Sequence, residues 1–284
     1  MEKQKRVMAV HDISCFGKCS LTVALPVLSA AGVEVSVIPT AVLSTHTGGF
    51  TGFTYRDLTE DIPKITQHWK TLNLGFDGIY TGFLGSFEQI HLVSELFDDF
   101  KGKDTLILVD PVMADNGELY KSFGPEFPQE MVKLCRKADV IVPNMTEAAL
   151  LLDEPYRAGP YSKAYIDGLL EKLSGFGPQQ IVLTGVYFDE GNLGAAAYDK
   201  KTGEISYVLS NRIEGSYHGT GDVFASALLS AMLNGFPLSK AVRVAVNFTA
   251  GSIARTKEAK TDVRFGVNFE AGIPQFVREL GLSQ

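Results

Sequence analysis

The chain has little of several residue types that mark specialised classes of protein. Its 284 residues include 3 Cys and 1 Trp, and 26 Lys and Arg stand against 33 Asp and Glu. The odd number of cysteines, Cys15, Cys19 and Cys135, without the spacing of a zinc site, predicts reduced thiols rather than a disulfide framework. The basic run KQKR is short, and the net charge of −7 argues against a nucleic-acid partner.

Long apolar runs are also missing. Near the N-terminus, residues 7–10 are apolar before a His-Asp pair, which is too short for the core of a signal peptide. The uncharged stretch 19–33 contains Pro26 and several hydroxyls and is too short to span a membrane. A composition of 45% hydrophobic and 21% charged residues is typical of a folded globular chain. We therefore expect a cytoplasmic protein without a membrane partner.

Short β-branched runs alternate with stretches of helical spacing along most of the chain. The strand-like runs lie at 6–10, 33–38, 76–82, 105–110, 138–144 and 180–185. The helical stretches between them lie at 21–32, 87–100, 130–138 and 164–176. This alternation predicts an α/β fold with a mostly parallel sheet that carries helices on both faces.

The later part of the chain follows a different pattern. Residues 193–210 predict a β-hairpin, and two long helices are expected at about 220–234 and 238–257. No linker, repeat or low-complexity segment divides the chain, so we expect one domain over residues 1–284. Ligands of parallel sheets bind beyond the carboxyl ends of the strands. The residues that follow predicted strands are therefore candidate site residues: Asp12, Gly82, Asp110, Asn144 and Thr184.

The stretch Gly219-Thr220-Gly221-Asp222 opens the first of the two long helices. The unpaired amides of a first helical turn, together with the macrodipole, form a site for an anion. One interpretation is that Thr220 or Asp222 only caps the helix. The other is that the amides neutralise charge on a transferring phosphoryl group while Asp222 takes the proton from an attacking hydroxyl. These residues alone leave both interpretations open.

The segments around this turn resemble a known family. HGTGDVFASALL (218–229) resembles the C-terminal signature of the ribokinase-like kinase superfamily. Five further motifs are similar to its pyridoxal/pyridoxamine kinase branch and occur in that branch's order: LSTHTGGF (43–50), FDGIYTGFLGS (76–86), VDPVMADNG (109–117), ADVIVPNMTEAALL (138–151) and IVLTG (181–185). The resemblance covers nearly the whole chain. It implies a three-layer α/β/α fold and ATP-dependent phosphorylation of the 5′-hydroxymethyl group of a B6 vitamer by a homodimer.

The resemblance also implies roles for individual residues. Asp222 would be the catalytic base, and the amides of Gly219, Thr220 and Gly221 would form the anion hole. The nucleotide would contact Asp110, Asn144, Glu147, Thr184, Gly185, Val246 and Asn247. Asp115 and Glu147 would hold Mg²⁺, and the family pattern allows K⁺ as a further cofactor. The B6 vitamer would contact Asp12, His46, Thr47 and Phe83 in addition to Asp222.

Purely structural interpretations compete with these roles. Asn144 and Glu147 match a helix capping box, and Asp110 and Asp115 flank a turn that contains a proline. The segment 45–59, rich in glycine and aromatic residues, fits either a lid that excludes water or an ordinary surface loop.

The chain also departs from the family pattern. Val142 stands where relatives often have Thr before Pro-Asn, which puts a side-chain contact with a phosphate or a monovalent cation in doubt. Asp12 and Phe83 replace the Ser and Tyr of many pyridoxal kinases. One hypothesis is that the Asp12 carboxylate favours pyridoxamine through a charge-assisted hydrogen bond to the amine.

Other functions remain open on the sequence. Hydroxymethylpyrimidine kinases of the same fold typically carry Cys where Asp222 stands, and sugar kinases of this fold carry an N-terminal Gly-Gly motif that is missing here. A non-catalytic vitamer-binding protein would not need an intact Asp222 between its glycines and its helix. The B6 kinase is therefore the first interpretation.

Overall fold

The computed structural model describes residues 3–282. The chain groups into two compact units, the first formed by Met1–Gly78 and Ile213–Gln284 and the second by Ile79–Arg212. One domain over the full length stays a prediction. Across residues 3–282, no helix has both the length and the apolar character that a membrane crossing requires.

The strands of the first unit carry its predicted substrate residues. β1 (Arg6–Ser14) pairs in parallel with β2 (Glu34–Leu43), and β3 (Tyr55–Asp57) pairs antiparallel with β2. The first half of β1 forms because residues 7–10 are apolar, two of them are β-branched valines, and all four are completely buried. In the second half of β1 the polar residues His11, Asp12 and Ser14 are also buried, so the strand places buried polar side chains at its carboxyl end.

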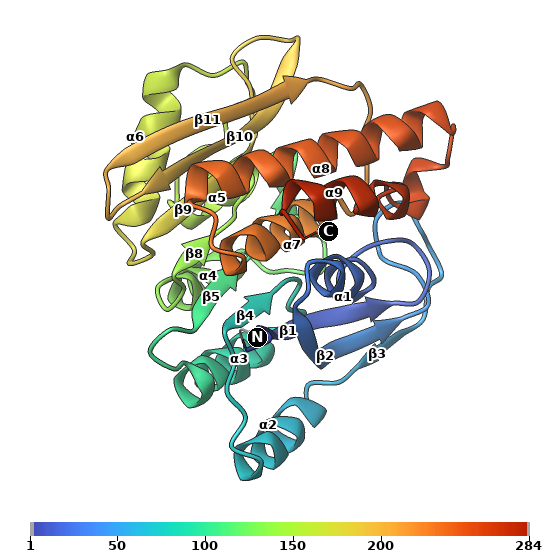
Figure 1. Cartoon of the computed structure of the whole chain (residues 1–284), viewed down its shortest axis with the longest axis vertical. Helices are drawn as coiled ribbons and strands as arrows, with labels where there is room; N and C mark the ends of the chain where they lie inside the picture. Colours follow the sequence, from blue (N-terminus) through green and yellow to red (C-terminus); the bar gives the residue numbers. More distant parts are fainter. Residues whose placement is uncertain (1–2, 283–284) are drawn as a thin grey trace. The chain divides into compact units, whose positions relative to one another are not determined.

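Five helices belong to the first unit. α1 (Leu21–Ala30) packs on β1 and on α7 (Thr220–Leu233), and α7 packs along α8 (Leu238–Glu258) (Figure 1). α2 (Asp61–Thr71) lies against β2, and α9 (Ile273–Glu279) follows two short 3-10 turns and contacts α8. α7 is buried along nine consecutive residues, 223–231, because α1 and α8 cover it. Its first turn, which carries the predicted anion site, is therefore anchored by a packed helix.

The second unit alternates strands and helices. Its strands are β4 (Gly78–Thr81, whose first residue ends the first unit), β5 (Leu106–Val109), β6 (Ala114–Asp115), β7 (Glu118–Leu119), β8 (Val140–Ile141), β9 (Gln180–Val186), β10 (Asn192–Asp199) and β11 (Glu204–Asn211). Its helices are α3 (Phe87–Phe100), α4 (Phe127–Cys135), α5 (Met145–Leu151) and α6 (Lys163–Ser174). β5, β8 and β9 pair in parallel. β10 pairs antiparallel with both β9 and β11, and β10 and β11 form the predicted hairpin (Figure 1).

These elements confirm the predicted α/β class, in which a mostly parallel sheet carries helices and a small hairpin. α3 has both of its predicted ends because Ser86 caps it and its apolar residues recur at helical spacing. β8 is much shorter than its predicted run, since Pro143 cannot donate to a sheet and Asn144 already caps the next helix. α2 was not predicted from the sequence, although its Ile62, Ile65 and Trp69 recur at helical spacing; in the structure it buries Ile62 and Thr66.

Candidate active site

The turn before α7 has the geometry of an anion site. Gly219 is the N-cap and has φ 75°, a left-handed conformation that favours glycine. A Cβ on Gly219 would lie 2.0 Å from the carbonyl oxygen of Lys18, so the segment before α1 presses directly on the turn. The backbone ladder of α7 begins with the amide of Val223, which donates to Gly219 O at 3.1 Å. The amides of Thr220 and Gly221 precede that ladder, as an anion hole requires.

Asp222 lies in the first turn of α7 and is partly buried. Burial is the main cause that raises the pKa of its carboxyl to about 7, and the charge of Asp12 raises it further. A hydrogen bond from the backbone amide of Ser20 acts in the opposite direction and lowers that pKa. A carboxylate with a pKa near 7 suits a general base at neutral pH.

Asp12 lies near the carboxyl end of β1 and is 4% exposed. The Ser20 hydroxyl donates to Asp12 Oδ1 at 2.5 Å, and the Ser14 hydroxyl donates to Asp12 Oδ2 at 3.2 Å. Burial raises the pKa of Asp12, and these hydroxyl bonds partly offset the rise. Asp12 and Asp222 therefore belong to one polar cluster in the first unit.

Cys19 lies in the same cluster. Burial, followed by the negative charges of Asp222 and Asp12, raises the pKa of its thiol well above the usual range. The thiol therefore stays protonated at neutral pH and is a poor nucleophile.

His46 ties the segment 43–50 to the C-terminal part of the first unit. Its Nε2 lies 2.6 Å from the carbonyl oxygen of Arg264, and its Nδ1 accepts the amide of Gly48 at 3.1 Å. Because Nδ1 is an acceptor, Nε2 carries the proton, and the ring is the neutral Nε2–H tautomer. Burial lowers the pKa of His46 and favours this neutral form. Thr47 beside it is exposed. The predicted vitamer contacts of both residues stay predictions.

Aromatic rings surround His46. Phe50 packs edge-on against the His46 ring at 4.9 Å and stacks on Phe265 at 6.4 Å between centroids. Phe16 meets Phe265 edge-on at 5.0 Å, although half of its surface is exposed. The segment 45–59 is thus held to two other loops of the first unit through Phe50. Its movement as a lid stays a prediction.

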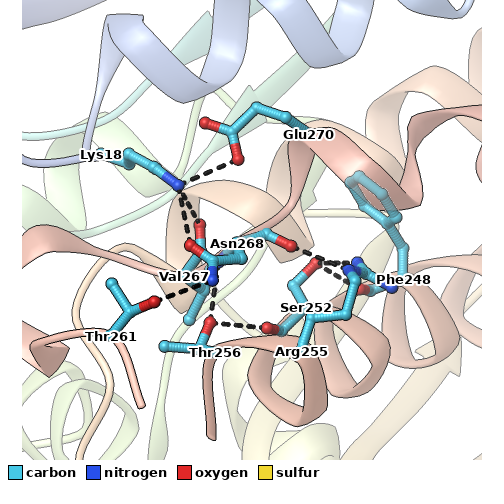
Figure 2. A network of polar contacts seen from close by, with 9 residues as sticks. All are labelled: Lys18, Phe248, Ser252, Arg255, Thr256, Thr261, Val267, Asn268 and Glu270. Carbon is cyan, nitrogen blue, oxygen red and sulfur yellow. Dashed lines mark hydrogen bonds and ion pairs between the residues drawn. The ribbon is translucent and has the colours of Figure 1, made fainter. Parts of the chain in front are cut away.

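Lys18 connects the segment before α1 to the strap that follows α8, residues 261–272 (Figure 2). Its ammonium donates to Val267 O at 3.3 Å, to Asn268 Oδ1 at 3.1 Å and to Glu270 Oε2 at 2.9 Å. Asn268 in turn is held by Thr256, Thr261 and Arg255. Lys18 also contacts two glycines closely, since a Cβ on Gly266 would lie 2.7–2.9 Å from the Cβ, O and N atoms of Lys18. This network fixes the segment that presses on the Gly219 turn.

In the second unit, Asn144 and Glu147 form the capping box that their sequence predicts. The Asn144 side chain accepts the amides of Thr146 and Glu147, and the Glu147 carboxylate accepts the amide of Asn144 at 2.8 Å. Glu147 also accepts the amide of Met113 at 3.1 Å and is 3% exposed. Burial raises the pKa of Glu147 to about 8, and the charge of Asp115 adds to the rise.

The other predicted nucleotide residues of the second unit lie near this box. Thr184 forms an isolated parallel bridge with Asn144, and its amide donates to Pro143 O at 3.0 Å. Gly185 follows with φ 76°, where a side chain would be strained. Buried Asp110 ends β5, and its amide donates to Thr81 O at 3.1 Å. The carboxyl ends of β5, β8 and β9 thus gather the predicted residues, as parallel strands require.

The remaining predicted residues have different surroundings. Phe83 packs against Phe123 at 5.5 Å in the second unit. Val246 is buried in α8, and the exposed Asn247 donates to Glu279 of α9 at 2.7 Å. The predicted roles of Val246 and Asn247 in an adenine pocket stay predictions.

The oxygen donors of the second unit fit Mg²⁺. Among residues 3–282, no three His, Cys, Asp or Glu side chains gather to hold a metal ion by themselves. Mg²⁺ usually binds through one or two carboxylates together with waters and substrate phosphates. Asp115 is exposed and offers carboxylate oxygens, whereas the oxygens of Glu147 already accept backbone amides. These oxygen atoms therefore suit a Mg²⁺ ion that binds together with the phosphates of a nucleotide.

Sequence reasoning missed Ser20 and Lys18. Both lie in the segment FGKCS (16–20), which carries no strand or helix pattern. Asp12 is 8 residues from Ser20, but Asp222 and the partners of Lys18 are distant in the sequence, 250 residues for Lys18 and Asn268. The one local sign was the pair of small residues Gly17 and Ser20 between a predicted strand and a predicted helix, a position where α/β proteins bind ligands.

Comparisons with known proteins agree with this arrangement. The family model named phosphomethylpyrimidine kinase matches residues 25–266. A protein from Bacteroides thetaiotaomicron named putative phosphomethylpyrimidine kinase, crystallised with pyridoxal, is 41% identical with a TM-score of 0.92, and the match covers 96% of each chain. The pyridoxal kinase from Lactobacillus plantarum is 31% identical with a TM-score of 0.89, and the match covers 97% of this chain and 98% of that one.

A more distant relative covers a similar share of the chain. The pyridoxine/pyridoxal/pyridoxamine kinase of Bordetella avium is 25% identical over 265 residues, which are 89% of this chain and 86% of that protein. The structural matches confirm the ribokinase-like fold that the motifs predicted. The protein therefore belongs to the phosphomethylpyrimidine kinase family, and pyridoxal kinases are among the proteins with a structure similar to its own.

Proposed function

We propose that the protein transfers the γ-phosphoryl group of ATP to the 5′-hydroxymethyl group of a B6 vitamer. The observation that carries the proposal is the Asp222 carboxylate, which has a pKa of about 7 and lies in the first turn of α7 beside the amides of the Gly219 turn. The relatives support the choice of substrate, because one of them was crystallised with pyridoxal and others are pyridoxal kinases.

In the proposed reaction Asp222 accepts the proton of the substrate hydroxyl. The hydroxyl oxygen forms a bond to the γ-phosphorus, the bond from that phosphorus to the β–γ bridging oxygen breaks, and ADP leaves. The amides of Gly219, Thr220 and Gly221 neutralise charge on the transferred group without reorganising, because α7 holds their positions. Asp222 releases the proton to solvent after the product leaves.

The second unit supplies the proposed nucleotide contacts, through Asp110, Asn144, Thr184 and Gly185. Asp115 and Glu147 would hold Mg²⁺. When it is bound, Mg²⁺ neutralises charge on the phosphates. Requirements for Mg²⁺ and K⁺ are tested by activity in EDTA with Mg²⁺ added back and in buffers where choline replaces K⁺. Assembly as a homodimer is tested by light scattering.

A second candidate is a kinase for hydroxymethylpyrimidine. The name of the family model favours it, whereas the acid at Asp222, where such kinases typically carry Cys, argues against it.

The decisive experiment measures ADP release with pyridoxal, pyridoxine, pyridoxamine, hydroxymethylpyrimidine and simple sugars. We expect turnover of at least one B6 vitamer, and Asp222→Asn should lower the rate by roughly 10²- to 10⁴-fold because the general base is lost. Asp104→Asn, which changes an exposed carboxylate on a loop of the second unit, is the matched control. Turnover confined to hydroxymethylpyrimidine would select the second candidate. Normal turnover by Asp222→Asn would refute the mechanism for any substrate.

A further inference from the structure

Ser20 forms hydrogen bonds with both Asp12 and Asp222. Its hydroxyl donates to Asp12 Oδ1 at 2.5 Å, and its backbone amide donates to Asp222. The residue has φ 53° and ψ −127°, a conformation that side-chain-bearing residues rarely adopt. Strained backbone of this kind persists where its surroundings require it, and such positions cluster at active sites.

The geometry argues against Asp12 as a direct ligand of the substrate. Asp12 is 4% exposed, and each of its oxygens accepts a hydroxyl from the chain itself, one from Ser20 and one from Ser14. A substrate amine would have to displace these donors to reach the carboxylate. The carboxylate is instead oriented by its own neighbours.

Other titratable groups belong to the same part of the first unit. Cys19 faces both, and its thiol stays protonated. Burial is the main cause that raises the pKa of Tyr55 to about 12, and the charge of Asp12 contributes to the rise. His218 precedes the turn and its ring lies 5.2 Å from that of neutral His46. The ammonium of Lys18 is directed to Glu270 and Asn268. Among the causes that shift the pKa of Asp222, the charge of Asp12 is the one that comes from another titratable group.

We infer that Asp12 is a positioning residue for the phosphoryl transfer: Ser20, which bonds to both acids, keeps the Asp12 carboxylate beside Asp222, and the charge of Asp12 favours uptake of the substrate proton by Asp222. The inference rests on the proposed function of Asp222. A negative charge at Asp12 disfavours a second negative charge at Asp222, so Asp222 accepts a proton more readily. Ser20 holds the two side chains at a fixed separation, and the proton taken from the substrate hydroxyl goes to Asp222. Asp12 does not touch the reacting atoms.

The first experiment compares pH profiles of kcat/KM for wild type and Asp12→Asn. Asparagine keeps the size of the side chain and an oxygen for the Ser20 hydroxyl, and its amide can donate to Ser14, so only the charge is lost. In wild type the acid limb should fall near pH 7, and in Asp12→Asn it should move to lower pH by roughly one unit. The weaker base should also lower kcat at pH 8 by roughly three-fold. The ratios of kcat/KM among the three vitamers should stay the same.

A selective loss of kcat/KM for pyridoxamine, with an unmoved acid limb, would overturn the inference and support Asp12 as a ligand of the amine. An acid limb that moves to higher pH would overturn it as well, because removal of a like charge cannot raise the pKa of Asp222.

The second readout does not need activity. The carboxyl resonances of the protein labelled with ¹³C at the aspartate side chains are titrated by NMR, and Asp222 is assigned from the spectrum of Asp222→Asn. The midpoint of Asp222 should fall in Asp12→Asn. If no vitamer is phosphorylated but the midpoint falls, the proposed function is wrong and the coupling of the two acids stands. An unchanged midpoint overturns the inference even in an active kinase.

Ser20→Ala tests the link itself. Loss of the hydroxyl disfavours the charged form of Asp12, so the Asp222 midpoint should fall by less than in Asp12→Asn. In the Asp12→Asn background the same change should add almost nothing, which a double-mutant cycle measures. Ser29→Ala, at an exposed position near the other end of α1, is the control and should leave the midpoint unchanged. Additive effects of the two substitutions would show that Ser20 does not act through Asp12.

Discussion

Replacement of the general base should stabilise the fold in a pH-dependent way. Burial raises the pKa of Asp222 from 3.8 to about 7, so the folded protein pays a cost for the ionised form that the unfolded chain does not. The difference corresponds to about 4 kcal/mol at 1.36 kcal/mol per pKa unit, and partial access to solvent reduces it to about 2–3 kcal/mol. Asp222→Asn removes this cost, because the amide is neutral at every pH.

The sign of the effect follows from the direction of the shift. At a pH below 3.8 the carboxyl is protonated in both states, and the substitution should change the free energy of unfolding little. As the pH rises toward 7, only the unfolded state ionises freely, and wild type loses stability relative to the variant. The full increase in the free energy of unfolding that Asp222→Asn causes is therefore reached above the folded-state pKa, near pH 8.

The measurement is the melting temperature of wild type, Asp222→Asn and the control Asp104→Asn at pH 4.5 and pH 8. For a chain of this size a gain of 2–3 kcal/mol raises the melting temperature by roughly 5–10 °C. We expect such a rise for Asp222→Asn at pH 8, a much smaller one at pH 4.5 and none for the control. A lower melting temperature at pH 8, or an equal gain at both pH values, would refute the electrostatic account of the site.

Three further predictions concern the framework around the site. Gly219→Ala should destabilise the protein by about 2 kcal/mol or more, because the added Cβ meets the Lys18 carbonyl at 2.0 Å, whereas Gly32→Ala, at φ 78° with open space, should cost only about 1 kcal/mol in urea unfolding. Lys18→Met should speed amide exchange in residues 261–272 and lower kcat, and an unchanged exchange pattern would contradict its role. Asn144→Ala should cost about 1 kcal/mol through loss of the α5 cap, and no loss in unfolding experiments would show that α5 does not depend on it.

The parts of the fold that sequence could predict are those with a local pattern. α3 and the β10–β11 hairpin follow from periodicity and turn residues within short windows. The Asn144 capping box also follows from residues three positions apart. Asp222 could be identified because its turn and helix are continuous in the sequence, and the ordered motifs assigned it a role.

The rest depends on contacts between distant residues. The bond between His46 and the Arg264 carbonyl joins residues 218 positions apart, and no window of sequence contains both. Serine is a residue type that often caps helices, and Ser20 is the N-cap residue of α1. Its hydroxyl nevertheless donates to Asp12 and makes no bond to the amides of α1. Patterns within a short stretch of sequence do not indicate which partner such a side chain bonds to. The partner is determined by the packing of the folded unit.

The two compact units are arranged differently along the sequence, which affects the order in which the ribosome makes them. The second unit is one continuous stretch, Ile79–Arg212, whereas the first unit is divided between the beginning and the end of the chain. A ribosome therefore releases every residue of the second unit before α7 exists. During that interval α1 exposes the buried surface that α7 will cover, which is a state prone to aggregation.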